Sequence, residues 1–102
     1  MSPAHVTEQA PPPVGSAVRV LVDGRAIAIF NLGTALYAID ANCTHVRGPL
    51  EKGPITGDLV TCPWHGSQFD LRTGEVRRGP ATQPVRCYPV RVENQRLVVE
   101  IP

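Results

Sequence analysis

The first half of the chain carries the two-residue hydrophobic period of β-strands. Apolar Val18, Val20 and Val22 alternate with Arg19 and Leu21, so one face of this segment is apolar throughout. The pair Asp23-Gly24 follows, which is typical of a two-residue hairpin turn. Further apolar segments at 26–30 and 35–39, separated by a second turn, predict the returning strand and a third one. This pattern predicts an antiparallel β-meander.

The middle of the chain loses this regularity. Residues 40–56 show neither strand nor helix periodicity, and Gly48-Pro49 and Gly53-Pro54 would break any helix, so we predict a long loop. Short strands are expected at 58–62 and 68–71.

A final hairpin is expected at the C-terminal end. After an irregular loop at 79–84, the apolar segments 85–92 and 97–101 flank a polar turn at 93–96. No helix of any length is predicted. Short strands with frequent turn signals predict an all-β fold, a small antiparallel sandwich or barrel.

Composition narrows the functional classes. With 102 residues and a formal net charge of +1, the chain is expected to form one small domain without affinity for nucleic acid or for a membrane surface. The polar start of the chain lacks a secretion pattern, and only three cysteines are present. These features favour a reducing, cytoplasmic location.

Two mixed pairs of metal-binding residue types lie in the irregular region. Cys43-x-His45 and Cys62-x-x-His65 are separated by sixteen residues. A zinc site of this composition normally pairs cysteine with cysteine and histidine with histidine. One Cys and one His per pair instead suit a centre with two unlike irons, such as a 2Fe–2S cluster in which two histidines replace two cysteines.

This constellation resembles the Rieske family, and the similarity extends beyond the four ligand positions. The flanking positions that share it are Thr44, Leu50, Pro63, Gly66, Ser67, Phe69 and Asp70. The surrounding sequence is similar to Rieske ferredoxins throughout residues 15–101, whereas residues 1–14 form a poorly patterned N-terminal segment. We therefore expect a single Rieske domain at 15–102, with an inserted cluster-binding subdomain of short strands and loops at about 41–84.

The resemblance assigns roles to individual residues. It implies that Cys43 and Cys62 bind one iron and that His45 and His65 bind the other. Ser67 would donate a hydrogen bond to a bridging sulfide, with a solvated loop serine as the alternative. A structural zinc site with the same four ligands is the competing interpretation of the motif.

The resemblance also implies a function. The chain would be a soluble one-electron carrier that passes electrons from an NAD(P)H-dependent flavoprotein reductase to a terminal oxygenase of aromatic hydrocarbon catabolism. The alternative is a small Rieske subunit of a nitrite reductase-like or other oxidoreductase complex. No nucleophile–base pair is visible, so the chain is not expected to be an enzyme by itself, and a monomer is expected.

Other features leave two interpretations open. Respiratory Rieske proteins carry a membrane anchor and a disulfide between the ligand loops; here the disulfide positions are Gly48 and Trp64. Trp64 is interpreted as a packing residue or an electron relay, and Cys87 as an inert thiol or a redox sensor. Arg77 and Arg78 would either dock an acidic partner or belong to a solvated turn.

Overall fold

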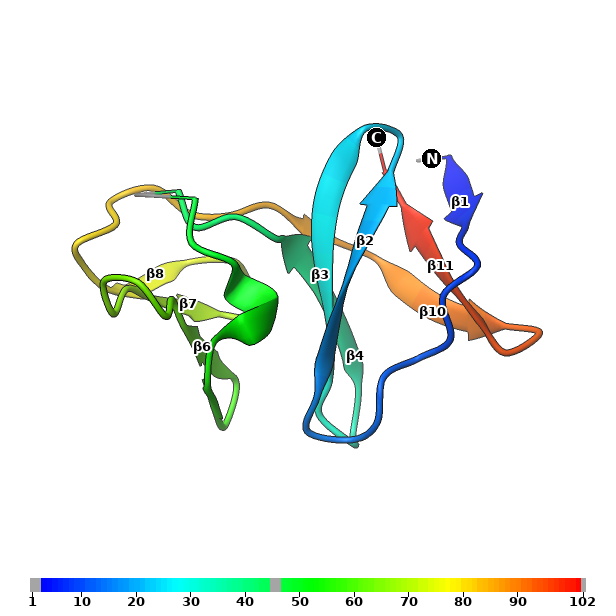
Figure 1. The fold of residues 1–102 in the computed structure, drawn as a ribbon, viewed down its shortest axis with the longest axis horizontal. Coiled ribbons are helices and arrows are strands. Elements are labelled where there is room, and N and C mark those ends of the chain that lie inside the picture. Colours follow the sequence, from blue (N-terminus) through cyan, green and yellow to red (C-terminus); the bar gives the residue numbers. More distant parts are fainter. Residues whose placement is uncertain (1–2, 45–46, 102) are drawn as a thin grey trace.

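The protein folds into three antiparallel sheets (Figure 1). The computed structural model describes residues 3–44 and 47–101. The strands in this part of the chain are β1 (Ala4–Val6), β2 (Ala17–Val22), β3 (Arg25–Asn31), β4 (Leu36–Asp40), β5 (Ile55–Thr56), β6 (Leu59–Thr61), β7 (Gln68–Asp70), β8 (Val76–Arg78), β9 (Cys87–Tyr88), β10 (Val90–Glu93) and β11 (Arg96–Glu100). One turn of 3-10 helix, η1 (Leu50–Lys52), accompanies them, where the sequence predicted no helix of any length.

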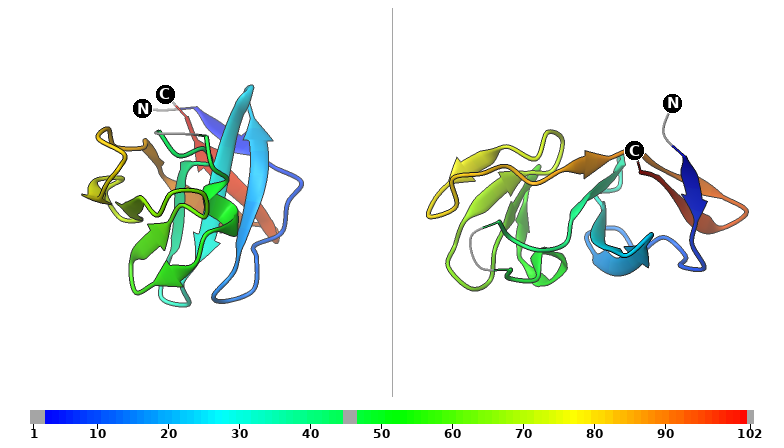
Figure 2. Two further views of the ribbon diagram at one scale, coloured as in Figure 1. Left: turned by 60° about the vertical axis from the view of Figure 1, so that its left-hand side comes forward. Right: turned by 90° about the horizontal axis from the view of Figure 1, so that it is seen from above.

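Two of the sheets pack together into one part of the molecule, and we call them the base sheets. Their strand orders are β2-β3-β4-β9 and β1-β11-β10. Figure 2 shows the same fold from two further sides. Apolar side chains of both sheets share one buried cluster, in which Ile27 and Ile29 from β3 accompany Leu97 and Val99 from β11. The predicted antiparallel sandwich is therefore confirmed.

The third sheet, β5-β6-β7-β8, builds the subdomain that lies at the left of Figure 1. Its core contains Val60 and Phe69 together with Ala28 and Phe30 from the other face of β3. Strand β3 is thus covered on both faces, which explains why its sequence is a continuous apolar run and not an alternating one.

The predicted single strand at 85–92 is wrong, because the chain changes sheets within it. Cys87 and Tyr88 pair with β4, whereas Val90 to Glu93 pair with β11. Pro89 lies between the two strands and has no N–H with which to continue a ladder. Its carbonyl accepts a hydrogen bond from the amide of Glu100 (2.9 Å).

The N-terminal segment contains a strand that the sequence pattern did not predict. β1 pairs with the edge of β11, and the amide of Ile101 donates to the carbonyl of Pro3 (3.0 Å). The proline-rich stretch that follows is held by Asn31, whose amide donates to the carbonyl of Pro12 (2.8 Å). No helix in the described part of the chain has the length and hydropathy that crossing a membrane requires.

Candidate metal centre

The two loops that carry the Cys/His pairs have the same backbone hydrogen bonds. In the first, the amide of Cys43 donates to the carbonyl of Gly48 (3.0 Å), and the amide of Arg47 donates to the carbonyl of Cys43 (2.9 Å). In the second, the corresponding bonds run from Cys62 to Ser67 (2.7 Å) and from Gly66 to Cys62 (3.1 Å). Each loop therefore closes around its cysteine in the same way.

This loop geometry requires a left-handed residue four positions after each cysteine. Gly66 supplies it with φ +80°, but in the first loop the position is occupied by Arg47, with φ +56°. An L-residue pays a steric cost in this region, whereas glycine does not. The equivalence of the loops was missed at the sequence level, because Arg47 gives no turn signal.

Gly48 lets the two loops approach each other. A Cβ atom at this position would lie 2.5 Å from the sulfur of Cys62 and 3.4 Å from Cγ of Trp64. Trp64 thus covers Gly48 with one part of its side chain, yet 59% of the residue is exposed. Packing therefore accounts for only a part of the Trp64 surface.

The expected ligands differ in their exposure. Cys43 and Cys62 are 2% and 1% exposed and lie in the core cluster of the subdomain, whereas His65 is exposed. The fourth expected ligand, His45, lies outside the described residues. Among the residues that are described, no three His, Cys, Asp or Glu side chains are grouped so that they could hold a metal ion. The ligand set therefore stays a prediction.

A third loop, residues 79–84, is bound to both ligand loops. The amide of Ala81 donates to Oγ of Ser67 (2.9 Å), and Oγ1 of Thr44 donates to the carbonyl of Gln83 (2.7 Å). Ser67 is completely buried, so the interpretation as a solvated loop serine is wrong. Because its oxygen accepts the Ala81 bond, its own hydroxyl proton can be donated to a further acceptor.

A buried carboxylate stabilises the hairpin behind the ligand loops. Asp70 is 1% exposed and accepts bonds from the guanidinium of Arg72 (3.1 Å) and that of Arg77 (3.0 Å). These arginines, and the Arg72 amide at 2.8 Å, hold the pKa of Asp70 far below its usual range. The two arginines predicted to dock a partner or to be solvated are both exposed, but Arg77 also has an internal partner in Asp70.

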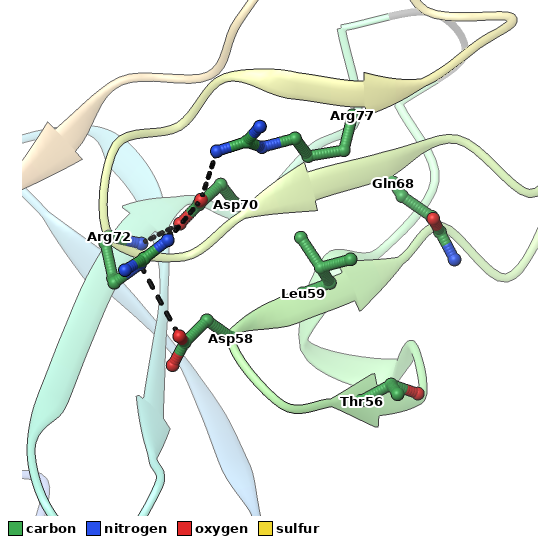
Figure 3. A pocket seen from close by; sticks show the side chains of 7 residues that line it. All are labelled: Thr56, Asp58, Leu59, Gln68, Asp70, Arg72 and Arg77. Atoms are coloured by element: carbon green, nitrogen blue, oxygen red, sulfur yellow. Dashed lines mark hydrogen bonds and ion pairs between the residues drawn. The ribbon is translucent and has the colours of Figure 1, made fainter.

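The Asp70 cluster lines a shallow hollow of about 440 Å³ on the β5–β8 sheet (Figure 3). Figure 3 shows the Asp70 carboxylate between the two guanidinium groups, with Asp58 facing Arg72 from the other side. Positive and negative groups in the hollow balance each other, and none of the three expected ligands that the structure describes lines it. We assign it a structural role.

Cys87 does not have the environment of a reactive thiol. Partial burial, followed by the negative charges of Asp70 and Asp40, raises the pKa of the thiol. A raised pKa lowers the thiolate fraction at neutral pH. This supports the interpretation of Cys87 as an inert thiol.

The residues of the site fit a Rieske cluster. Such a cluster needs thiolates on one iron and imidazoles on the other, which are chemically unlike ends. Here both thiols are buried and the described imidazole is at the surface, so the chain offers a dry sulfur side and an accessible nitrogen side. The buried hydroxyl of Ser67 adds a donor next to Cys62 in the same loop.

Comparison with known proteins identifies the family. Residues 3–89 match the Rieske [2Fe-2S] domain. The ferredoxin component of the naphthalene 1,2-dioxygenase system from Pseudomonas aeruginosa is 34% identical over 89 residues, which cover 87% of this chain and 86% of that protein.

Solved structures agree with this assignment. A chain from the complex of reduced oxygenase and oxidized ferredoxin in carbazole 1,9a-dioxygenase matches with a TM-score of 0.79 and 31% identity, covering 86% of this chain and 82% of that one. A protein assigned as the NADH-dependent nitrite reductase small subunit from Mycobacterium tuberculosis has a TM-score of 0.84, but at 21% identity it shows the fold alone; the match covers 100% of this chain and 97% of that one. The chain therefore belongs to the Rieske [2Fe-2S] family, and it is a ferredoxin-type electron carrier with one Rieske 2Fe–2S cluster rather than an enzyme.

Proposed function

We propose that Cys43 and Cys62 bind one iron of the cluster as thiolates and that His45 and His65 bind the other as imidazoles. The observation that carries this proposal is the contrast in exposure between the buried cysteines and the exposed His65. When bound, the cluster supplies reversible one-electron chemistry.

The surrounding residues have separate tasks in this proposal. The apolar core around Cys43 and Cys62 excludes water from the sulfur side and lowers the local dielectric, which strengthens every hydrogen bond made there. Ser67 is held by the Ala81 amide with its hydroxyl proton available for a sulfur acceptor. The exposed side of His65 is the short route by which an electron enters and leaves.

The carrier works between two proteins in our proposal. A flavoprotein reductase that uses NAD(P)H delivers the electron, and the terminal oxygenase of an aromatic-ring dioxygenase system accepts it. Support comes from the naphthalene dioxygenase relative and from the ferredoxin that forms a complex with an oxygenase in the carbazole system. We further propose that the chain is monomeric and cytoplasmic, and that it binds neither nucleic acid nor membranes.

Reconstitution tests the proposal. The purified protein should contain two irons and two acid-labile sulfides per chain. With NADH, a reductase and an oxygenase from such a system, substrate turnover should rise with the amount of this protein, and the protein alone should convert nothing. One zinc per chain in a colourless protein would overturn the cluster assignment.

The second candidate is a permanently bound subunit of a nitrite reductase-like enzyme, and the match in fold along the whole chain is consistent with it. Isolation of the protein from its own host distinguishes between these two candidate functions. A carrier should elute as a free protein of 11.0 kDa, whereas a subunit should elute in fixed stoichiometry with a larger enzyme.

A further inference from the structure

Charge is distributed unevenly around the three loops of the site. We call the exposed surface formed by the described residues of loops 43–48, 62–67 and 79–84, together with Arg78, the tip face. The loops lie together, since Gly48 contacts Trp64, Thr44 bonds to Gln83, and Ser67 bonds to Ala81. This face contains two arginines, Arg47 and Arg78, and no Asp or Glu.

The two arginines of the tip face differ from most others in the molecule. Four other arginines form ion pairs within the chain, namely Arg19, Arg72, Arg77 and Arg91. Among the described residues, Arg47 and Arg78 form no ion pair, and both are exposed. Arg47 moreover occupies a position with a strained φ of +56°, which glycine would adopt without steric cost. Their charges are therefore available to a partner.

Trp64, in the second Cys/His loop, packs next to Gly48 of the first, and 59% of its surface is exposed to water. A surface that presents both an exposed tryptophan and arginines has the composition of an interface, because these two residue types are enriched among residues that dominate binding energies. The only other large apolar residues exposed in the described part of the chain are valines and Leu21, and these lie on the base sheets or in the N-terminal segment.

We propose that the tip face docks onto a carboxylate-rich surface of a redox partner protein, with Trp64 at the centre of the contact and Arg47 and Arg78 at its rim. The proposal rests on the proposed function and adds the chemistry of the partner. The partner surface would carry Asp and Glu side chains around an apolar depression that receives Trp64. Rim charges of this kind steer the encounter and make it dependent on salt.

Voltammetry tests the charge of the partner without knowledge of its identity. The holoprotein is applied to gold electrodes that carry alkanethiol layers of equal length, ending either in carboxylate or in ammonium groups. We expect reversible one-electron signals on the carboxylate layer and much smaller signals on the ammonium layer. The carboxylate signal should fall as salt rises from about 0.01 to 0.5 M, because the screening length shortens from about 30 Å to a few ångströms.

Matched substitutions locate the contact. Arg47→Gln and Arg78→Gln should each lower the bound electroactive amount on carboxylate by roughly two- to fivefold at low salt. Arg96→Gln removes the same charge from an exposed position at the start of β11, a strand that lies far from the tip face in Figure 1, and should change nothing. An equal loss for Arg96→Gln, or equal signals on both layers, would overturn the docking proposal.

Measuring the contribution of Trp64 to docking requires an electrode layer that presents apolar groups. On layers that mix carboxylate and methyl ends, Trp64→Ser should lower the bound amount at every salt concentration while the salt dependence stays unchanged. An unchanged amount would remove Trp64 from the contact. Iron and sulfide content is measured for each protein. A missing cluster refutes the proposed function. An intact cluster together with binding that is the same on both layers and in all variants refutes the docking proposal alone.

Discussion

Asp70→Asn should destabilise the protein without a change in shape. The wild-type carboxylate is 1% exposed and accepts bonds from Arg72 and Arg77 at 3.1 and 3.0 Å. Asparagine occupies the same volume and can still accept the Arg72 amide bond, but its NH₂ group must face guanidinium donors. The substitution therefore replaces charge-assisted bonds by neutral or unsatisfied ones.

The expected loss of stability in Asp70→Asn follows from the hydrogen bonds and the exposure of the groups involved. A hydrogen bond to a charged group contributes about 1 kcal/mol more than a neutral one. The side chains of Arg72 and Arg77 are 53% and 47% exposed, so solvent screening reduces this difference for each. An unsatisfied donor adds about 1 kcal/mol, giving about 2 kcal/mol in total. For a domain of this size, that corresponds to a thermal midpoint lower by about 8–16 °C.

Thermal unfolding of the holoprotein, followed by circular dichroism and by cluster absorbance at one scan rate, measures the effect. Asp58→Asn is the matched control, because the side chain of Asp58 is 48% exposed and its one ion pair among the described residues is with Arg72, at 3.5 Å. We expect the control to change the free energy of unfolding by less than about 0.5 kcal/mol. Equal midpoints for the two variants would refute the assignment of Asp70 as the anchor of the hairpin.

Comparison of the wild type with Asp70→Asn also tests how the contribution of Asp70 to stability depends on pH. The pKa of Asp70 is depressed in the folded protein, so its contribution is fully present above the unfolded value of about 3.9 and is lost as pH falls through the folded value. The difference between wild type and Asp70→Asn should be constant from about pH 5 upwards and should shrink in acid. A difference that grows in acid would contradict the sign.

Three further predictions concern single positions. Gly48→Ala would place a methyl group 2.5 Å from the Cys62 sulfur. Iron and sulfide per chain should therefore fall, and the free energy of unfolding should decrease by about 1–3 kcal/mol. A variant with a full complement of iron and sulfide and unchanged stability would contradict this contact. Arg47→Gly should relieve a left-handed φ and raise the thermal midpoint, with a gain below about 1 kcal/mol because glycine costs chain entropy; a lower midpoint would show that the side chain stabilises the loop. Alkylation of Cys87 near neutral pH should be slower than that of a free cysteine and should accelerate with rising pH, since its pKa is raised; measured rates equal to those of a model thiol would contradict this.

Local patterns predicted most of the base sheets. The alternation at 18–22 and the pair Asp23-Gly24 led to a hairpin that the structure contains, with φ of +51° and +78° at the two turn residues. Strand β1 escaped prediction because it is short and obtains its hydrogen bonds from β11, at the other end of the chain. The split at Pro89 was readable from the sequence, since proline interrupts a ladder, but the apolar run on both sides concealed it.

The sequence predicted those parts of the site that depend on residue types and their spacing. The mixed Cys/His pairs indicated the cluster, and the family match bears this out. The bonds that tie the third loop to Ser67 and Thr44 involve backbone groups of Ala81 and Gln83, which no side-chain motif reveals. Arg77 reaches Asp70 across the β7–β8 hairpin, so its role depends on register and not on spacing along the chain.

The pairing of β1 with β11 has a practical consequence for chain connectivity. Because the Ile101 amide bonds to the Pro3 carbonyl, the two described ends of the chain lie a single hydrogen bond apart (Figure 1). A short peptide linker can therefore close the chain into a ring, and new termini can be opened at the exposed Asn94-Gln95 turn. Such a circular permutant keeps every strand pair of the three sheets and presents an attachment point at the end remote from the loops that carry the Cys/His pairs.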